Sequence, residues 1–132
     1  RIKKEYDALI NGKGNSTREA IPAIEQSYQQ EIFDEFVEPI LITSPEGIPV
    51  KIEENDSIIC FNYRADRVSQ LIRALVEPEF NEFKTKKINL YFVSFANLEK
   101  EIKNVHDAYK KEKLKNTFED FASILQLKSF SL

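Results

Sequence analysis

The chain has 132 residues, of which 42% are hydrophobic and 31% are charged, a composition typical of one globular domain or of one piece of a larger protein. No apolar stretch approaches the roughly 20 residues that a membrane-spanning helix needs, and a net charge of −3 argues against nucleic-acid binding. A single cysteine, Cys60, and a single histidine, His106, exclude an internal disulfide and a cysteine-rich or multi-histidine metal centre within the chain.

The chain contains no methionine and begins with Arg1. Because an intact translation product starts with methionine, we expect a piece excised from a longer protein. The alternative is a chain that lacks only a short native start. We treat residues 1–132 as a single domain piece, within which residues 33–56 form an acidic, loop-rich segment.

The first predicted element is an amphipathic helix over residues 2–10. Its apolar side chains recur at helical spacing: Ile2, Tyr6, Leu9 and Ile10. The asparagines and glycines of residues 11–15 are expected to end this helix, because both residue types tolerate the left-handed backbone conformation of a C-cap.

A second helix is predicted to begin near Thr17, because Ser16 and Glu19 have the spacing of a capping box. Its expected buried stripe consists of four apolar residues: Ile21, Ile24, Tyr28 and Ile32. Pro22 lies early in this stretch and predicts either a kink or a later start, because proline is tolerated only in the first turn of a helix.

The segment 33–56 combines acidic side chains with prolines and a glycine. Between Glu25 and Asp56 the chain has nine acidic residues and one basic residue, Lys51. The apolar run 40–42 is a strand candidate. Three carboxylates are candidate cation ligands, although an acidic loop usually only faces solvent: Asp34, Glu35 and Glu38.

The centre of the chain predicts a strand, a helix and a second strand. Residues 57–62 are a short apolar run typical of a strand buried on both faces, so Cys60 within it is expected to be an inert core thiol. Apolar residues over 68–75 have helical spacing, and Pro78 ends the helix. Residues 88–95 predict the next strand. The fold class is therefore α/β, a partly parallel sheet with flanking helices.

The remaining residues predict a helix, a lysine-rich stretch over 110–115, another helix and a last strand. The first of these helices rests on four apolar residues: Leu98, Ile102, Val105 and Tyr109. His106 lies beside that stripe, so it is expected to be packed or solvated rather than catalytic. Thr117 and Asp120 predict the start of the next helix, and residues 127–132 alternate as a strand would.

The turn between the first central strand and its helix, residues 61–67, carries the most distinctive chemistry. It holds Arg64 and Arg67, two of only five arginines in the chain, with Asp66 between them. Ligands of open α/β sheets gather at the carboxyl ends of strands, and a helix N-terminus favours anions. Since guanidinium binds carboxylate or phosphate through two hydrogen bonds, this turn is a candidate anion site. The alternative is purely structural: Asp66 caps the helix, and the arginines pair with acidic neighbours.

Two segments share motifs with a known enzyme family. Residues 34–39 read Asp-Glu-Phe-Val-Glu-Pro, and residues 61–67 read Phe-Asn-Tyr-Arg-Ala-Asp-Arg, with Gln70-Leu71 behind them. This order resembles the cofactor-independent phosphoglycerate mutases, in which a DEFV-P sequence precedes a D-hydrophobic-FFNFR sequence followed by DR-x-x-QL. The resemblance covers nearly all of the chain. Residues 94–97, Ser-Phe-Ala-Asn, depart from it, because the family more often has Met-Thr and a tyrosine there.

The resemblance implies a fragment of a larger two-domain enzyme. In that family an alkaline-phosphatase-like domain carries a serine nucleophile and two divalent metal ions, usually manganese, and an inserted domain clamps the phosphoglycerate. The chain resembles the C-terminal part of the inserted domain. We therefore expect Arg64 and Arg67 to bind the phosphate or carboxylate of the substrate, with Asp66 shaping the turn, and no catalytic residue or metal ligand in this chain.

The function implied is the substrate-binding part of a cytoplasmic, glycolytic mutase that interconverts 3-phosphoglycerate and 2-phosphoglycerate through a phosphoserine. The expected partners are these phosphoglycerates and the metal-bearing domain of the same enzyme, with no nucleic acid and no membrane. The chain alone is expected to be inactive. The alternatives are a non-catalytic module that binds a phosphopeptide or another anion through the same arginines, and a pure assembly domain.

Overall fold

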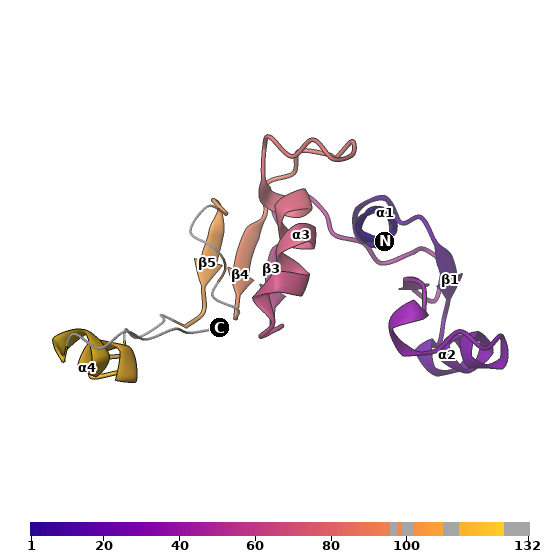
Figure 1. Cartoon of the computed structure of the whole chain (residues 1–132). Coiled ribbons are helices and arrows are strands. Elements are labelled where there is room, and N and C mark those ends of the chain that lie inside the picture. Colours follow the sequence, from indigo (N-terminus) through magenta and orange to yellow (C-terminus); the bar gives the residue numbers. More distant parts are fainter. Residues whose placement is uncertain (96–97, 99–101, 110–113, 126–132) are drawn as a thin grey trace.

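The computed structural model describes residues 1–95, 98, 102–109 and 114–125, apart from the side chain of Arg67. Its helices and strands follow one another as shown in Figure 1: α1 (Ile2–Asn11), β1 (Asn15–Thr17), α2 (Ala20–Gln29), the 3-10 helix η1 (Asp34–Phe36), β2 (Ile40–Ile42), β3 (Ser57–Cys60), α3 (Ala65–Val76), β4 (Tyr91–Ser94), β5 (Val105–Asp107) and α4 (Phe118–Ile124). None of the described helices is both long enough and apolar enough to span a bilayer.

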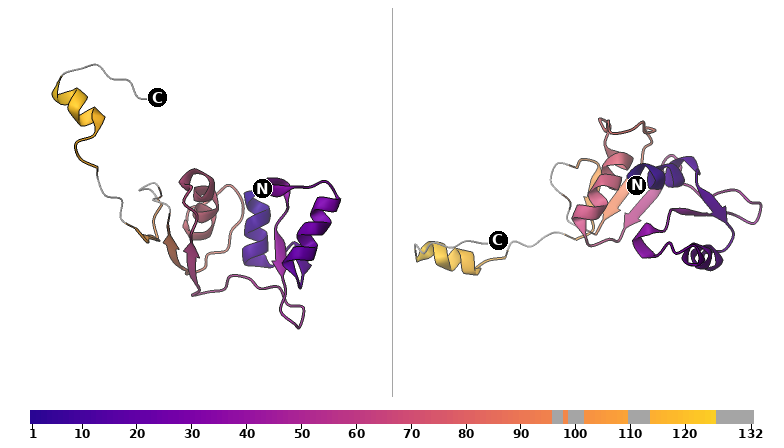
Figure 2. Two further views of the ribbon diagram at one scale, coloured as in Figure 1. Left: turned by 90° about the horizontal axis from the view of Figure 1, so that it is seen from below. Right: turned by 45° about the vertical axis from the view of Figure 1, so that its right-hand side comes forward.

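Two small parallel sheets organise the described part of the chain. β1 pairs with β2, so that Asn15 lies opposite Ile40. β3, β4 and β5 form the second sheet in that order, and each pair of neighbours is parallel. Figure 2 shows α1 beside α3, between the two sheets. The predicted α/β class, with parallel strands and flanking helices, is confirmed.

The hydrophobic core lies where α1 and α3 meet the larger sheet. Its buried members are Tyr6, Ile10, Ile72, Ala74, Leu75, Phe92, Leu98 and Ile102. Tyr6 is only 1% exposed, and its ring lies edge-on to Phe83 with the ring centroids 5.4 Å apart. The Tyr6 hydroxyl accepts a hydrogen bond from the Lys86 N–H at 2.8 Å. The loop between α3 and β4 is thereby attached to the core.

The strongest periodic patterns of the sequence are confirmed. α1 ends at Asn11, and Gly12 follows with φ 61°, the left-handed C-cap conformation that favours glycine. α3 ends at Val76, two residues before Pro78. β3 and β4 pair in parallel on either side of α3 in the sequence, which is the predicted strand–helix–strand unit.

The predicted start and burial of the second helix are wrong. α2 begins at Ala20, whereas Thr17 belongs to β1 and its hydroxyl oxygen accepts from the Glu19 N–H at 3.3 Å. The later start puts Pro22 in the first turn, which is one of the two outcomes predicted for it. No residue of α2 is buried: although α2 contacts β2 and the Tyr28 ring lies against Phe33, Ile21 and Ile24 of its apolar stripe are exposed.

β3 is not buried on both faces. Ile58 and Cys60 are half-buried and pack against the core, whereas Ile59 is 65% exposed. Successive side chains of a strand point to opposite faces, and among the described residues no helix covers the second face of this sheet. Cys60 is therefore a half-buried thiol rather than the fully buried one expected.

The helix predicted from the apolar spacing of residues 98–109 is wrong. Val105 belongs to β5, where it pairs with Phe92 and packs against the core. His106 lies in the same strand, and its ring stacks on Tyr91 at a centroid distance of 4.5 Å. The apolar spacing fitted a helix, but long-range pairing with β4 determines the structure at this point.

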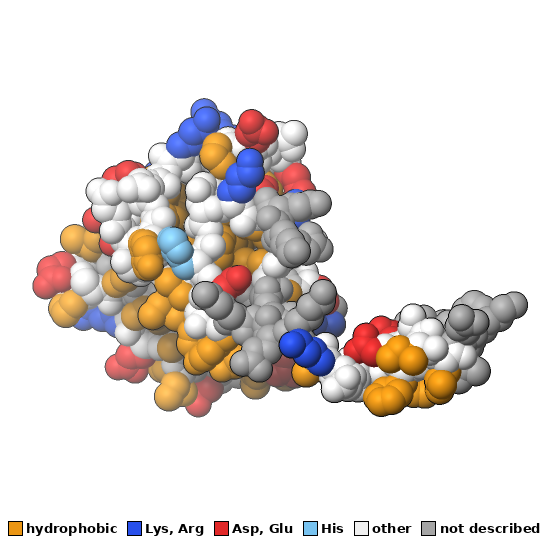
Figure 3. Space-filling model, turned by 90° about the vertical axis from the view of Figure 1, so that its left-hand side faces the viewer, with side chains coloured by type: hydrophobic (Ala, Val, Ile, Leu, Met, Phe, Trp, Pro, Cys, Tyr) orange, Lys and Arg blue, Asp and Glu red, His pale blue; other side chains and the backbone are white. Residues whose placement is uncertain are grey.

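α4 begins as predicted. Thr117 and Asp120 form both hydrogen bonds of a capping box, but the apolar residues Phe118 and Phe121 are exposed. Figures 1 and 3 show α4 standing apart from the body of the molecule, with hydrophobic side chains on its surface. The strand predicted at 127–132, and residues 110–113 of the lysine-rich stretch, lie outside the described residues.

Candidate functional site

The arginine turn, residues 61–67, begins where β3 ends and runs into the first turn of α3. Because β3, β4 and β5 are parallel, their carboxyl ends lie at one edge of the sheet. Two backbone hydrogen bonds extend the pairing past the strands. The Phe95 N–H donates to the Cys60 carbonyl at 2.9 Å, and the Ala108 N–H donates to the Ser94 carbonyl at 2.8 Å. The residues that follow the three strands are thus held side by side.

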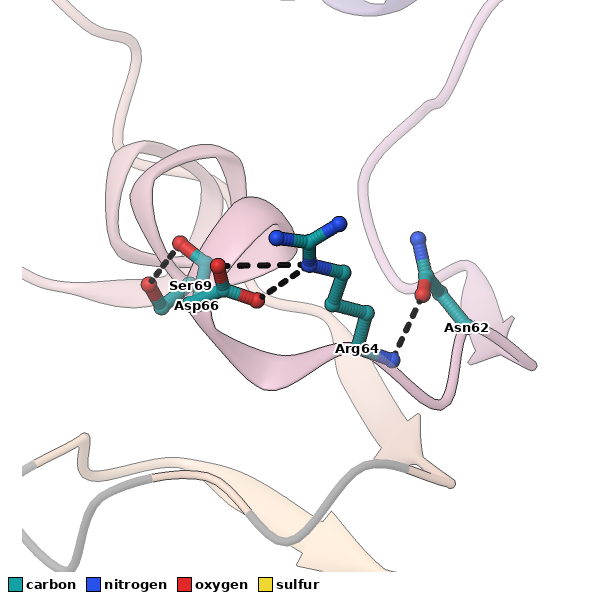
Figure 4. A network of polar contacts seen from close by, with 4 residues as sticks. All are labelled: Asn62, Arg64, Asp66 and Ser69. Carbon is teal, nitrogen blue, oxygen red and sulfur yellow. Dashed lines mark hydrogen bonds and ion pairs between the residues drawn. The ribbon is translucent and has the colours of Figure 1, made fainter. Parts of the chain in front are cut away.

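The side chain of Asn62 shapes the turn. Its Oδ1 atom accepts a hydrogen bond from the Arg64 backbone N–H at 2.8 Å, as Figure 4 shows. An asparagine bonded to its own backbone two residues further on is the signature of an Asx turn. Arg64 is the N-cap residue of α3, with extended φ −96° and ψ 96°. The Asn62 bond therefore fixes the backbone at the residue where the helix starts.

The structure brings Arg64 and Asp66 together. Arg64 Nε donates to both carboxylate oxygens of Asp66, at 3.0 and 3.3 Å (Figure 4), while the two side chains are 67% and 61% exposed. Among the described residues the Arg64 side chain forms hydrogen bonds only through Nε. Its two terminal nitrogens therefore keep their donor hydrogens for a further acceptor.

The alternative to an anion site is that Asp66 only caps the helix and that the arginines only pair with acidic neighbours. Asp66 is not the N-cap, because Arg64 holds that position and Asp66 lies in the first turn of α3. The pairing of an arginine with an acidic neighbour is present, but the pair is exposed to solvent, where such pairs are weak. Arg67 lies in α3, and its side chain is outside what the structure describes, so its role stays a prediction.

Three aromatic rings lie in a row, one after each strand of the sheet: Tyr63 within the turn, and Phe95 and Tyr109 beside it. The centroids of Tyr63 and Phe95 are 5.8 Å apart and those of Phe95 and Tyr109 are 5.2 Å apart, both edge to face. We call these residues the aromatic row. The sequence contained a signal for them, since an aromatic residue follows each strand within three positions, but assigning Tyr109 to a helix concealed it.

The carboxylates of the acidic segment do not come together at one place. Asp34 Oδ1 accepts from the Tyr28 hydroxyl at 3.0 Å, and this bond raises the pKa of Tyr28. Glu38 instead forms an ion pair with Lys4 of α1, at the edge of a 940 Å³ groove between α1 and residues 35–42. Among the described residues no group of three or more His, Cys, Asp or Glu side chains is placed to hold a metal ion. The described residues thus do not fit the two metal ions that the family resemblance implies.

A parallel sheet whose strand runs through an arginine-bearing turn into a helix defines an α/β protein of the strand–helix–strand class. The family model described as the BPG-independent PGAM N-terminus matches residues 1–100. The chain belongs to the 2,3-bisphosphoglycerate-independent phosphoglycerate mutase family.

Individual relatives agree with this family. The chain is 42% identical over 118 residues to the 2,3-bisphosphoglycerate-independent phosphoglycerate mutase of Flavobacterium psychrophilum, covering 89% of the chain and 23% of that protein. It is 41% identical over 128 residues to the protein of the same name from Clostridium tetani, covering 96% of the chain and 25% of that protein. The chain thus spans about a quarter of the length of these curated relatives.

A solved structure shares the fold. The crystal structure of Leishmania mexicana phosphoglycerate mutase at low cobalt concentration matches with a TM-score of 0.61 and 22% sequence identity. The match covers 70% of this chain and 18% of that chain. At this level of identity the match supports the fold.

Proposed function

We propose that this chain is the substrate-binding part of a phosphoglycerate mutase that interconverts 3-phosphoglycerate and 2-phosphoglycerate. The observation that carries the proposal is the position of Arg64, at the carboxyl end of β3 and the N-terminus of α3. Its Nε is engaged by Asp66, while its terminal nitrogens have no partner among the described residues. A guanidinium oriented in this way offers two parallel donors to a phosphate or a carboxylate.

Within this proposal the residues of the turn have different roles. Arg64 binds the phosphate or the carboxylate of the phosphoglycerate through its terminal nitrogens. Arg67, one helical turn further on, binds the same small anion, and the free N–H groups at the start of α3 add to the positive potential. Asp66 belongs to the binding site with the two arginines, where it shapes the turn and orients Arg64. The chain thereby positions the glycerate and neutralises its charge, which is the main protein contribution to phosphoryl transfer.

The complete enzyme requires a second domain. We assign the serine nucleophile, which would carry the phosphoryl group, to the phosphatase-like domain of the same cytoplasmic enzyme. The metal ions are assigned to that domain as well. Residues 1–132 then form one piece of the inserted domain, in which the acidic segment 33–56 contains β2 and its last part, residues 43–56, links the two sheets. Because the nucleophile lies in the other domain, we expect no turnover by this chain alone. Measurable mutase activity of the isolated chain would refute this assignment.

Calorimetric titration of the chain with 3-phosphoglycerate tests the proposal. Arg64→Ala is expected to weaken binding by about tenfold or more, since a charge-assisted hydrogen bond contributes about 1.5 to 3 kcal/mol. The matched control is Arg18→Ala, which removes another exposed arginine whose Nη2 donates to the Pro45 carbonyl at 2.9 Å. The control is expected to bind as the unsubstituted chain does.

Two results would contradict the proposal. One is equal loss of affinity in both arginine variants, which would indicate a general charge effect. The other is tighter binding of a phosphoserine peptide than of 3-phosphoglycerate, which would favour the non-catalytic module. In the complete enzyme we expect Arg64→Ala to lower kcat/KM, with a loss of about 2 to 3 kcal/mol in transition-state stabilisation.

A further inference from the structure

We infer that Phe95 is a positioning residue for the anion site, because it connects the aromatic row to the turn that carries Arg64. This inference rests on the proposed function, since it concerns the same site. Phe95 follows β4 directly and lies between the two other rings of the row, with centroid distances of 5.8 Å to Tyr63 and 5.2 Å to Tyr109. Among the described residues its ring is the only one in aromatic contact with both of the others.

The contact with Tyr63 constrains the backbone next to Arg64. Tyr63 lies between Asn62 and Arg64, the two residues joined by the hydrogen bond of the Asx turn. Its side chain is 76% exposed, so apart from the edge-to-face contact with Phe95 little protein surrounds it. The Phe95 backbone is itself held to β3 by its N–H bond to the Cys60 carbonyl. The turn is therefore fixed on one side by Asn62 and on the other by a ring attached to the neighbouring strand.

Such a constraint matters for a guanidinium that must bind a small anion. An unconstrained surface arginine loses conformational freedom when it orders on a ligand, and that entropy opposes binding. Holding the preceding residue in place reduces the loss before the ligand arrives. Tyr109 is 61% exposed at the other end of the row, so the three rings also present an apolar surface beside the charged turn. A bound anion next to this surface is less solvated, which strengthens its attraction to Arg64.

The test compares two phenylalanines that make edge-to-face contacts. Phe95→Leu removes both ring contacts but keeps apolar volume, and Phe95→Tyr keeps the ring. The control is Phe80→Leu, because Phe80 makes an edge-to-face contact with Phe83 at 4.8 Å, in the loop after α3. Each variant is titrated with 3-phosphoglycerate by calorimetry, and its unfolding temperature and the exchange rate of the Arg64 amide hydrogen without ligand are recorded.

We expect Phe95→Leu to weaken 3-phosphoglycerate binding by about tenfold, since two aromatic pairs are lost, and to accelerate exchange of the Arg64 amide. Phe95→Tyr should restore both quantities. Phe80→Leu should lower the unfolding temperature without changing either. Unchanged affinity and unchanged exchange in Phe95→Leu would overturn the inference, as would an equal loss of affinity in Phe80→Leu. If the unsubstituted chain does not bind 3-phosphoglycerate, the proposed function fails and the role of Phe95 fails with it. If the unsubstituted chain binds 3-phosphoglycerate and Phe95→Leu binds it equally well, only the inference about Phe95 fails and the proposed function stands.

Discussion

Arg64 and Asp66 lie two residues apart and form an ion pair in which one nitrogen, Nε, contacts both carboxylate oxygens. This arrangement differs from a bidentate fork, in which two guanidinium nitrogens each bind one oxygen. The acidic partner therefore orients the arginine without occupying its two terminal donors. A pair of this kind suits a binding group better than a stabilising salt bridge.

The first prediction concerns the stability of that pair. In a double-mutant cycle of Arg64→Ala and Asp66→Asn, we expect a coupling free energy of at most about 1 kcal/mol, because both side chains are exposed and solvent screens their attraction. Urea denaturation of the four proteins measures it. A coupling of about 3 kcal/mol would mean that the pair is structural, and would weaken its assignment to binding.

A second prediction addresses the Asx turn. Asn62→Leu removes the acceptor of the Arg64 N–H and is expected to lower the free energy of unfolding by about 1 kcal/mol or less, since water can replace the bond at this exposed position. Asn62→Asp keeps an acceptor oxygen and should restore the stability in chemical denaturation. Equal stability of the Leu and Asp variants would show that the bond contributes nothing to the turn.

Tyr6 provides a prediction about the core. Tyr6→Phe leaves the Lys86 N–H without its 2.8 Å acceptor at a site where the tyrosine is almost fully buried. We expect a loss of about 1 to 2 kcal/mol in the free energy of unfolding. Tyr91→Phe is the matched control, because Tyr91 is exposed and no hydrogen bond of its hydroxyl is found among the described residues. A cost as large in the control would contradict the role given to the Tyr6 hydroxyl.

The last prediction is a dependence of stability on pH. Asp7 accepts hydrogen bonds from Lys3 Nζ and Asn11 Nδ2, and these bonds hold the pKa of its carboxyl below the ordinary value of 3.8. A group whose pKa is lowered on folding contributes stability that is complete above its unfolded pKa. That stability is lost as the pH falls through the folded pKa. Urea midpoints across the acid range should therefore fall more steeply in the unsubstituted chain than in Asp7→Asn. Parallel profiles would exclude this contribution.

The elements that could be predicted are those whose signal is local. α1 carries a regular apolar stripe and a glycine at the position that requires a positive φ, and both are properties of a short stretch of sequence. β3, α3 and β4 were predictable for the same reason, because each is a strongly periodic or strongly apolar run. The arginine turn follows from them, since a strand followed by a helix determines where their junction lies.

The elements that were missed depend on distant partners. Thr17 lies in β1 because it pairs with Ile42, and Val105 lies in β5 because it pairs with Phe92. Capping-box spacing and helical spacing both arise by chance in short stretches, and long-range pairing overrides them. The aromatic row was missed for this reason too, since its third ring follows a strand that sequence periodicity assigned to a helix.

The hydrogen bond from the Phe95 amide to the Cys60 carbonyl implies an order in which the parts of the anion site form during folding. Arg64, Asp66 and Arg67 lie within the short stretch from β3 to α3, whereas the rings of Phe95 and Tyr109 in the aromatic row reach the turn only when β4 and β5 dock. Contacts between residues far apart in the chain close late and slowly, because loop-closure entropy opposes them. A nascent chain in which only β3 and α3 have formed thus already contains the charged residues of the turn. The neighbouring strands β4 and β5, which constrain the turn in the folded protein, join β3 in the sheet only later.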